Sequence, residues 1–297
     1  VLYLMLLVGM LAGALLFAVL LEPFSYFRLI QVIQGSAVVV AALNVIAMWQ
    51  MEKRRPDLTR FETPRPKFRE MFSELSATPG AMRLFCVVAL GTFGFGMQEI
   101  LLEPYGAEVL LMTVSQTTQL TAIFSTGMLV ALALSSGFMG GQGDPMKLAA
   151  VGAIAGVFGF AGVVIAGPTD SVFVFILGTF LIGLGNGLFA VGTLSAVMLL
   201  TQTATAGLVI GTWGAIQTTT LGLAIFFGGA LRDIAPVTLQ PFFNQSHSLP
   251  SHFGYSFVYH TEIALLFAAL IAIGPLVNRL RRDPFDPTKA RLGDFPT

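Results

Sequence analysis

The chain has 297 residues, of which 55% are hydrophobic and 11% are charged, and its mean hydropathy is +0.80. Soluble globular domains carry about 25% charged residues, so this composition excludes a soluble domain, a disordered chain and a disulfide-rich secreted scaffold. The formal net charge is zero and there is one cysteine, Cys86. We therefore expect neither a nucleic-acid partner nor a cysteine metal cluster.

Eight apolar stretches are long enough to cross a membrane as α-helices, which takes about 20 residues each. They cover residues 1–21, 29–51, 84–102, 117–139, 148–167, 172–199, 206–229 and 258–278. Pairs of glycines four residues apart predict close contacts between such helices, and they occur at Gly9/Gly13, Gly152/Gly156, Gly183/Gly187 and Gly207/Gly211. The sequence thus predicts an all-α polytopic membrane protein.

The basic residues predict how the helices are oriented. If segment 52–83 is cytoplasmic, all but two of the 16 Lys and Arg residues lie on that side, the exceptions being Arg28 and Arg232. This bias follows the positive-inside rule and places the C-terminus in the cytoplasm. The chain opens at Val1, without a Met and already inside an apolar stretch, so we expect it to be a piece of a longer chain.

Residues 52–83 divide the chain, because they form a long charged segment with four prolines between apolar stretches. We expect residues 1–51 to form two helices, 84–280 a six-helix bundle and 281–297 a cytoplasmic tail. Within the linker, Phe68, Met71, Phe72 and Leu75 have helical spacing and predict a short amphipathic helix. It either lies on the membrane surface, where it docks a partner, or packs under the bundle. Residues 230–257 are expected to form an interfacial loop rich in aromatic residues.

The densest group of polar residues near the membrane comprises Gln98, Glu99, Glu103 and Tyr105. Glu99 and Glu103 are four residues apart and are predicted to share a helix face. Carboxylates are costly in hydrocarbon, so the pair marks either a proton-coupled or ligand-coordinating site, or an anchor at the membrane interface where the helix ends before Pro104. The chain contains no nucleophile elbow, HExxH, P-loop or dinucleotide-binding motif, and we expect no enzyme activity.

Further polar side chains lie within other apolar stretches. Asn186 is in the sixth stretch, and Trp213 and Gln217 share a helix face in the seventh. Such groups either hydrogen-bond between helices or line a cavity, where an amide oxygen could bond a ligand or the magnesium of a chlorin. His260 is the best placed of the three histidines to be an axial ligand of such a magnesium. Asp144 followed by Pro145 is predicted to cap the fifth helix.

The string GFGMQEILLEPYGAEVL, from Gly94 to Leu110, closely resembles the seventh helix of the bacteriochlorophyll delivery family. This is the PucC and LhaA group within the major facilitator superfamily. Further strings match the family in order, at 28–36, 117–121, 143–145, 183–189, 211–217 and 228–233. The resemblance implies twelve helices in two halves, of which this chain holds the last eight.

The resemblance also implies a function: assembly of photosynthetic light-harvesting complexes, with bacteriochlorophyll bound as cargo or delivered to antenna apoproteins. The implied partners are antenna polypeptides, the reaction centre–antenna complex or bacteriochlorophyll synthase, and membrane lipids. The implied location is the bacterial cytoplasmic, intracytoplasmic photosynthetic membrane. The pigment-binding hypothesis rests on Gln98, Glu99, Glu103, Tyr105, Asn186, Trp213, Gln217 and His260. Two alternatives stay open, a proton-coupled exporter of a small solute and a pigment-free scaffold for antenna polypeptides.

Overall fold

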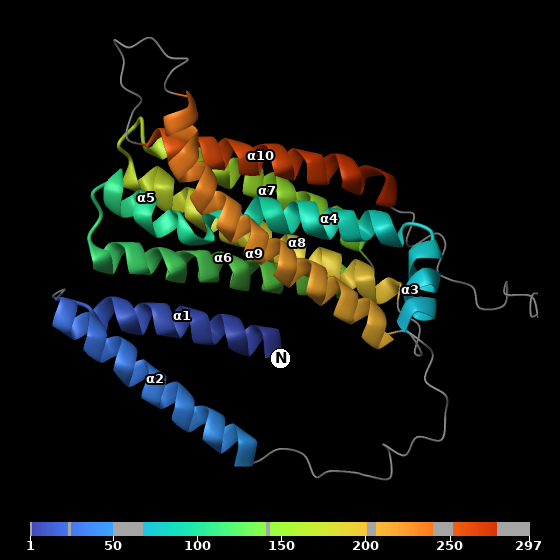
Figure 1. The fold of residues 1–297 in the computed structure, drawn as a ribbon, viewed down its shortest axis with the longest axis horizontal. Coiled ribbons are helices and arrows are strands. Elements are labelled where there is room, and N and C mark those ends of the chain that lie inside the picture. The colour runs from blue at the N-terminus through green and yellow to red at the C-terminus, as the bar shows by residue number, and fades with distance from the viewer. Residues whose placement is uncertain are drawn as a thin grey trace, which may run out of the picture.

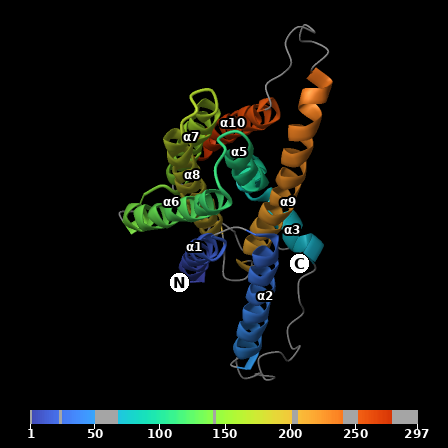
Figure 2. The same ribbon diagram turned by 90° about the vertical axis from the view of Figure 1, so that its left-hand side faces the viewer.

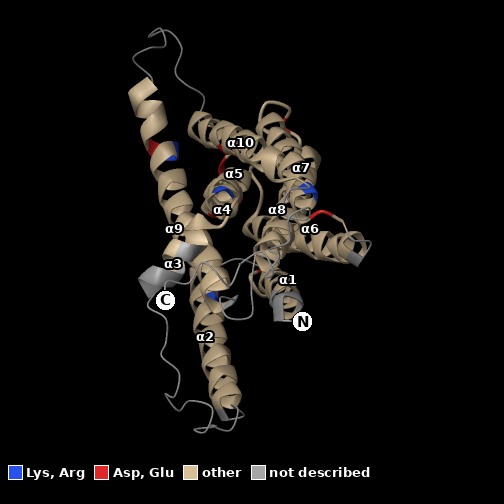
Figure 3. Cartoon of the chain, turned by 90° about the vertical axis from the view of Figure 1, so that its right-hand side faces the viewer, with Lys and Arg blue, Asp and Glu red and all other residues tan. Residues whose placement is uncertain are grey.

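The computed structural model describes residues 2–22, 25–49, 68–140, 143–200, 206–239 and 252–277. Within these ranges the chain is helical apart from short connections, and it contains no strand (Figure 1). Lys, Arg, Asp and Glu residues are sparse along the helices (Figure 3). The predicted all-α class is confirmed.

A helix is present at each predicted apolar stretch. Seven helices among the described residues are long and apolar enough to cross a membrane, and a shorter apolar helix covers Leu7–Leu20. The protein is therefore a polytopic helical membrane protein. In chain order, the apolar helices are α1 Leu2–Leu20, α2 Tyr26–Trp49, α4 Ala81–Gly96, α6 Val114–Gly140, α7 Pro145–Ala166, α8 Val172–Leu199, α9 Ala206–Leu239 and α10 Phe253–Ile273. Helix α4 continues into shorter helices.

The helices from α4 to α10 pack into one bundle (Figures 1 and 2). The most extensive helix–helix contact is between α7 and α8, where glycines replace side chains at the contact. A Cβ atom on Gly152 would lie 2.6 Å from the Gly185 carbonyl oxygen, and one on Gly185 would lie 2.6 Å from the Gly152 carbonyl oxygen. The predicted close packing is thus confirmed for Gly152/Gly156. Nothing in the described chain lies within 4 Å of a Cβ at Gly207 or Gly211.

The first two helices differ in how they pack. Helix α1 lies along α6, and the Ser115 hydroxyl donates a hydrogen bond of 3.3 Å to the Ala18 carbonyl oxygen. Helix α2 diverges from the bundle (Figure 1), and none of its apolar window is buried within the chain. Its amide side chain at Asn44 bonds the Val40 carbonyl oxygen of its own helix, at 2.9 Å.

The predicted amphipathic helix is present as α3, Phe68–Ala77. Leu75 is buried and joins the core of the bundle, and α3 contacts α4 and α9. This favours the interpretation in which the helix packs under the bundle. Residues 52–67 of the predicted linker and the predicted tail at 281–297 lie outside the described residues.

The predicted loop at 230–257 is wrong at both ends. Helix α9 continues to Leu239, and α10 begins at Phe253. Hydropathy suggested an earlier end because Arg232 and Asp233 interrupt the apolar run, but helical hydrogen bonding does not require apolar side chains beyond the hydrocarbon region. The loop residues Phe242, Phe243 and His247 lie outside the described residues.

The predicted cap of the fifth helix is confirmed. Asp144 precedes α7 in an extended conformation, and its carboxylate accepts a hydrogen bond of 2.9 Å from the Met146 backbone N–H. Pro145 occupies the first helical position, where its missing N–H leaves no hydrogen bond unmade. The cap fixes where α7 starts, and therefore which of its residues face α8.

Candidate functional site

The helix that carries the polar group is interrupted within the membrane-spanning segment. Helix α4 ends at Gly96, a 3₁₀ turn, η2, covers Met97–Ile100, and α5 covers Leu102–Glu108. The span predicted at 84–102 lies within one membrane-crossing segment, Ala81–Glu108, whose helix is interrupted by the 3₁₀ turn. Pro104 supplies a cause, because its ring clashes with the carbonyl group four residues earlier, at Ile100, and it has no N–H to donate there.

A small polar pocket opens beside this interruption, between α4, η2, α8 and α9. Three of the predicted site residues, Glu99, Asn186 and Gln217, line it together, although they come from segments far apart in the sequence. The remaining lining residues are Val88, Thr92, Phe95, Gly96, Phe189, Ala190, Thr193 and Leu221. The structure therefore brings one carboxylate, two amides and two hydroxyl groups to one place.

The carboxylate and the two amides of the pocket are available to a ligand. Among the described residues, the side chains of Glu99, Asn186 and Gln217 make no hydrogen bond to another residue. The cavity volume is ≈ 70 Å³, which holds a few water molecules, whereas sites that enclose a drug-sized ligand are about 300–1,000 Å³. The pocket can therefore accept a polar group at the edge of a large ligand, or a small solute.

Glu103 is held away from this pocket. Its Oε1 atom accepts a hydrogen bond of 2.7 Å from the Thr121 hydroxyl on α6. Glu99 and Glu103, predicted to share a helix face, thus have different surroundings, the pocket for Glu99 and α6 for Glu103. Only Glu99 of the two lines the pocket.

Gln98 and Tyr105 are structural rather than pocket residues. The Gln98 side chain is buried and its amide donates a bond of 3.3 Å to the Phe95 carbonyl oxygen. Tyr105 is also buried, and its hydroxyl donates a bond of 3.2 Å to the Val163 carbonyl oxygen on α7. Its ring packs edge-on against the ring of Tyr259, at 5.5 Å between centroids.

Trp213 and His260 also lie outside the pocket lining. Trp213 is one turn from Gln217 on α9 but packs against the hydrophobic core, where its indole N–H is buried without a partner among the described residues. His260 is exposed on α10, with its Nδ1 atom 2.6 Å from the Ser256 carbonyl oxygen of the same helix. Neither residue joins Glu99, Asn186 and Gln217.

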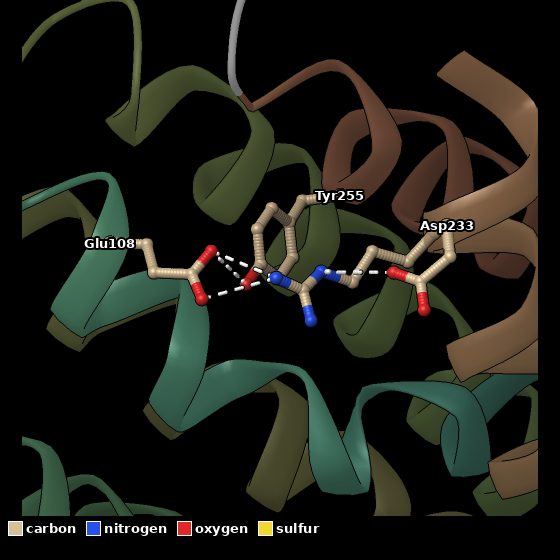
Figure 4. A network of polar contacts seen from close by, with 4 residues as sticks. Glu108, Asp233 and Tyr255 are labelled. Carbon is tan, nitrogen blue, oxygen red and sulfur yellow. Dashed lines mark hydrogen bonds and ion pairs between the residues drawn. The ribbon is translucent and has the colours of Figure 1, made fainter. Parts of the chain in front are cut away.

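A polar network at the opposite end of the bundle from α3 joins α5, α9 and α10 (Figure 4). Arg232 pairs with Glu108, with 2.9 Å between Nη2 and Oε2, and the Tyr255 hydroxyl donates to the same oxygen at 2.7 Å. The Arg232 guanidinium also lies 4.5 Å from the centre of the Tyr255 ring. The sequence analysis placed Arg232 on the side opposite segment 52–83 but gave no sign that it meets Glu108.

Glu262 is a further polar residue of the bundle to which the sequence analysis assigned no role. It is fully buried on α10, and its Oε1 atom accepts a hydrogen bond of 2.7 Å from the Gln98 backbone N–H. The signal that could have found it is its charge, since Glu99 and Glu262 are the two acidic residues inside the predicted apolar stretches.

The comparison with known proteins settles the family. A family model described as PUCC protein matches residues 1–280. The chain belongs to the PucC family. It is 42% identical over 276 residues to Protein PucC of Cereibacter sphaeroides, an alignment that covers 93% of this chain and 59% of the relative. This confirms the resemblance carried by the string from Gly94 to Leu110.

Two further relatives come from Rhodobacter capsulatus. A protein of the puhA–bchM intergenic region is 40% identical over 303 residues, covering all of this chain and 63% of the relative. A protein named bacteriochlorophyll synthase 44.5 kDa chain is 29% identical over 283 residues, covering 87% of this chain and 59% of the relative. The chain thus spans about three fifths of the length of these PucC-family relatives.

Proposed function

We propose that this chain takes part in assembling light-harvesting complexes in the membrane of a photosynthetic bacterium, and that bacteriochlorophyll is its cargo. We further propose that it binds and releases the pigment without covalent chemistry. Membership of the PucC family supports the first part, and the relative named as a bacteriochlorophyll synthase chain supports the second. The observation that carries the site is the convergence of Glu99, Asn186 and Gln217 on one pocket.

The chemistry of the pocket suits one edge of such a pigment. Magnesium prefers oxygen ligands, and the pocket offers a carboxylate and two amide oxygens that no described residue engages. A tetrapyrrole ring is too large for a cavity of ≈ 70 Å³. We therefore place the ring against the apolar surface outside the pocket, with its magnesium or a polar substituent held by the pocket groups.

The test is to purify the full chain gently from photosynthetic membranes and to extract and quantify the pigment per chain. We expect near-stoichiometric bacteriochlorophyll in the wild type and a loss of about tenfold in Glu99→Gln and Gln217→Leu, since each removes a charged or polar contact worth about 1–3 kcal/mol. The matched controls are Glu103→Gln and Asn44→Leu. They remove a carboxylate of the same span and a membrane amide, both outside the pocket.

Pigment retained equally in the pocket variants and the controls would refute the assignment of the site. A colourless wild-type protein that still carries antenna polypeptides, including in a strain unable to make bacteriochlorophyll, would refute the cargo and support a scaffold.

A second candidate function is proton-coupled export of a small solute, and the size of the pocket favours it. A cavity of ≈ 70 Å³ with one carboxylate can enclose a small polar solute completely. This function predicts flux in membrane vesicles that depends on an imposed pH gradient and is abolished in Glu99→Gln but kept in Glu103→Gln. Absence of such flux, together with bound pigment, would exclude the exporter.

A further inference from the structure

The interruption between α4 and α5 exposes backbone groups that a continuous helix would pair. In the hydrocarbon of a membrane, backbone groups that no cavity opens to water depend on partners within the protein. The Gln98 N–H finds one in the Glu262 carboxylate, at 2.7 Å, and the Phe95 carbonyl oxygen finds one in the Gln98 side chain, at 3.3 Å. Gln98 and Glu262 are 3% and 0% exposed, so neither has solvent as an alternative partner.

Neighbouring helices confine the interrupted segment on two sides. A Cβ on Gly94 would lie 3.0 Å from the Leu266 side chain of α10, and one on Gly228 of α9 would lie 2.9 Å from the Met97 carbonyl oxygen. The segment therefore has little room to shift as a whole. Its local conformation depends on the hydrogen bonds made within this space.

The conformation of the turn decides where two carboxylates point. A 3₁₀ turn advances about 120° per residue and an α-helix about 100°, so relative to a continuous α4 the turn Met97–Ile100 rotates Glu99, two steps into it, by about 40° and Glu103, beyond it, by about 60°. In the structure Glu99 lines the pocket, whereas Glu103 bonds Thr121 on α6.

We propose that Glu262 is a positioning residue: by accepting the Gln98 N–H it holds the 3₁₀ turn that directs Glu103 to α6 and leaves Glu99 as the carboxylate of the pocket. The inference rests on the proposed function only for what the pocket binds. The positioning itself is a property of the chain and is measured without a ligand.

The experiment follows Glu103 by cross-linking. In the full chain with Cys86→Ser, cysteines at Glu103 and Thr121 are joined by a short bifunctional thiol reagent in native membranes. These side chains are 2.7 Å apart at their oxygens, so we expect efficient cross-linking. Glu262→Leu removes the acceptor at similar volume and lowers the rate of cross-linking about tenfold, as expected when a buried donor loses its partner. Glu262→Gln keeps an acceptor oxygen and restores the rate.

Two controls separate positioning from general damage to the fold. Val258→Ala removes buried packing one turn away on the same face of α10 and leaves the rate unchanged. A second cysteine pair, at Ala18 and Ser115, joins α1 to α6 and cross-links equally in every background.

The proposal is overturned if Glu262→Leu cross-links Glu103 to Thr121 like the wild type, or if Glu262→Gln loses as much as Glu262→Leu. It is also overturned if the control pair falls in parallel, because Glu262 would then act on the whole fold. Loss of pigment binding alone contradicts the proposed function and leaves this result standing.

Discussion

Gly152→Ala tests whether the close approach of α7 and α8 sets the shape of the pocket. The added Cβ would lie 2.6 Å from both the Gly185 carbonyl oxygen and the Phe189 backbone nitrogen, about 0.8 Å short of ordinary contact at 3.4 Å. Both neighbours are backbone atoms that cannot rotate away, so the helices must separate. Overpacking of this kind costs about 1–3 kcal/mol.

The matched control is Gly137→Ala on α6, where a Cβ would meet nothing within 4 Å in the described chain. There the same substitution adds helix propensity and stabilises by up to about 1 kcal/mol. Thermal unfolding of the detergent-solubilised full chain measures both variants. At about 2–4 °C per kcal/mol, we expect Tm to fall by roughly 2–12 °C for Gly152→Ala and to stay or rise for Gly137→Ala.

Gly152→Ala also affects the pocket, because Asn186 and Phe189 of α8 are among the residues that line the pocket. Gly152→Ala is therefore also expected to lower ligand retention, whereas Gly137→Ala leaves it unchanged. Equal Tm values for the two variants, or a higher Tm for Gly152→Ala, would show that α7 and α8 do not approach as closely as the structure has them.

Three further predictions concern the ends of the helices. Arg232→Leu removes the ion pair with Glu108, which is partly exposed, and lowers the free energy of unfolding by about 0.5–1 kcal/mol, a difference that shrinks in high salt. Asp144→Ala removes the cap of α7 and costs about 0.5–2 kcal/mol in thermal unfolding, and Asp144→Asn restores most of it. Lys147→Cys, in the Cys86→Ser background, reacts with a membrane-impermeant thiol reagent from the cytoplasmic side of oriented vesicles only.

Hydropathy predicted the helices well because a membrane imposes one simple requirement on the backbone. A long apolar run must be helical in lipid, and α8 occupies the predicted stretch at 172–199. The interruption after Gly96 was missed although its signal, Pro104, was in view. Pro104 was interpreted as marking the end of the helix, whereas the chain continues helical, as α5, for a further turn and a half.

The site residues were predicted one by one, but their association could not be. Glu99, Asn186 and Gln217 stood out because polar groups are rare in apolar stretches. That these three meet, while Trp213 and Tyr105 turn to the core, depends on how α4, α8 and α9 pack. Packing across more than a hundred residues leaves no local pattern in the sequence.

The interruption itself gives the strongest argument that the pocket is a functional site. Irregular backbone at membrane depth is tolerated where it is buried in protein or lines a cavity, and in η2 Met97 and Gln98 are buried while Glu99 lines the pocket. A continuous helix would need neither Glu262 nor the Gln98 side chain to satisfy its backbone. The chain instead buries a carboxyl group, which costs several kcal/mol unless its hydrogen bonds are made. Such a cost is expected at a binding site, where a particular direction of Glu99 matters more than the stability of the helix.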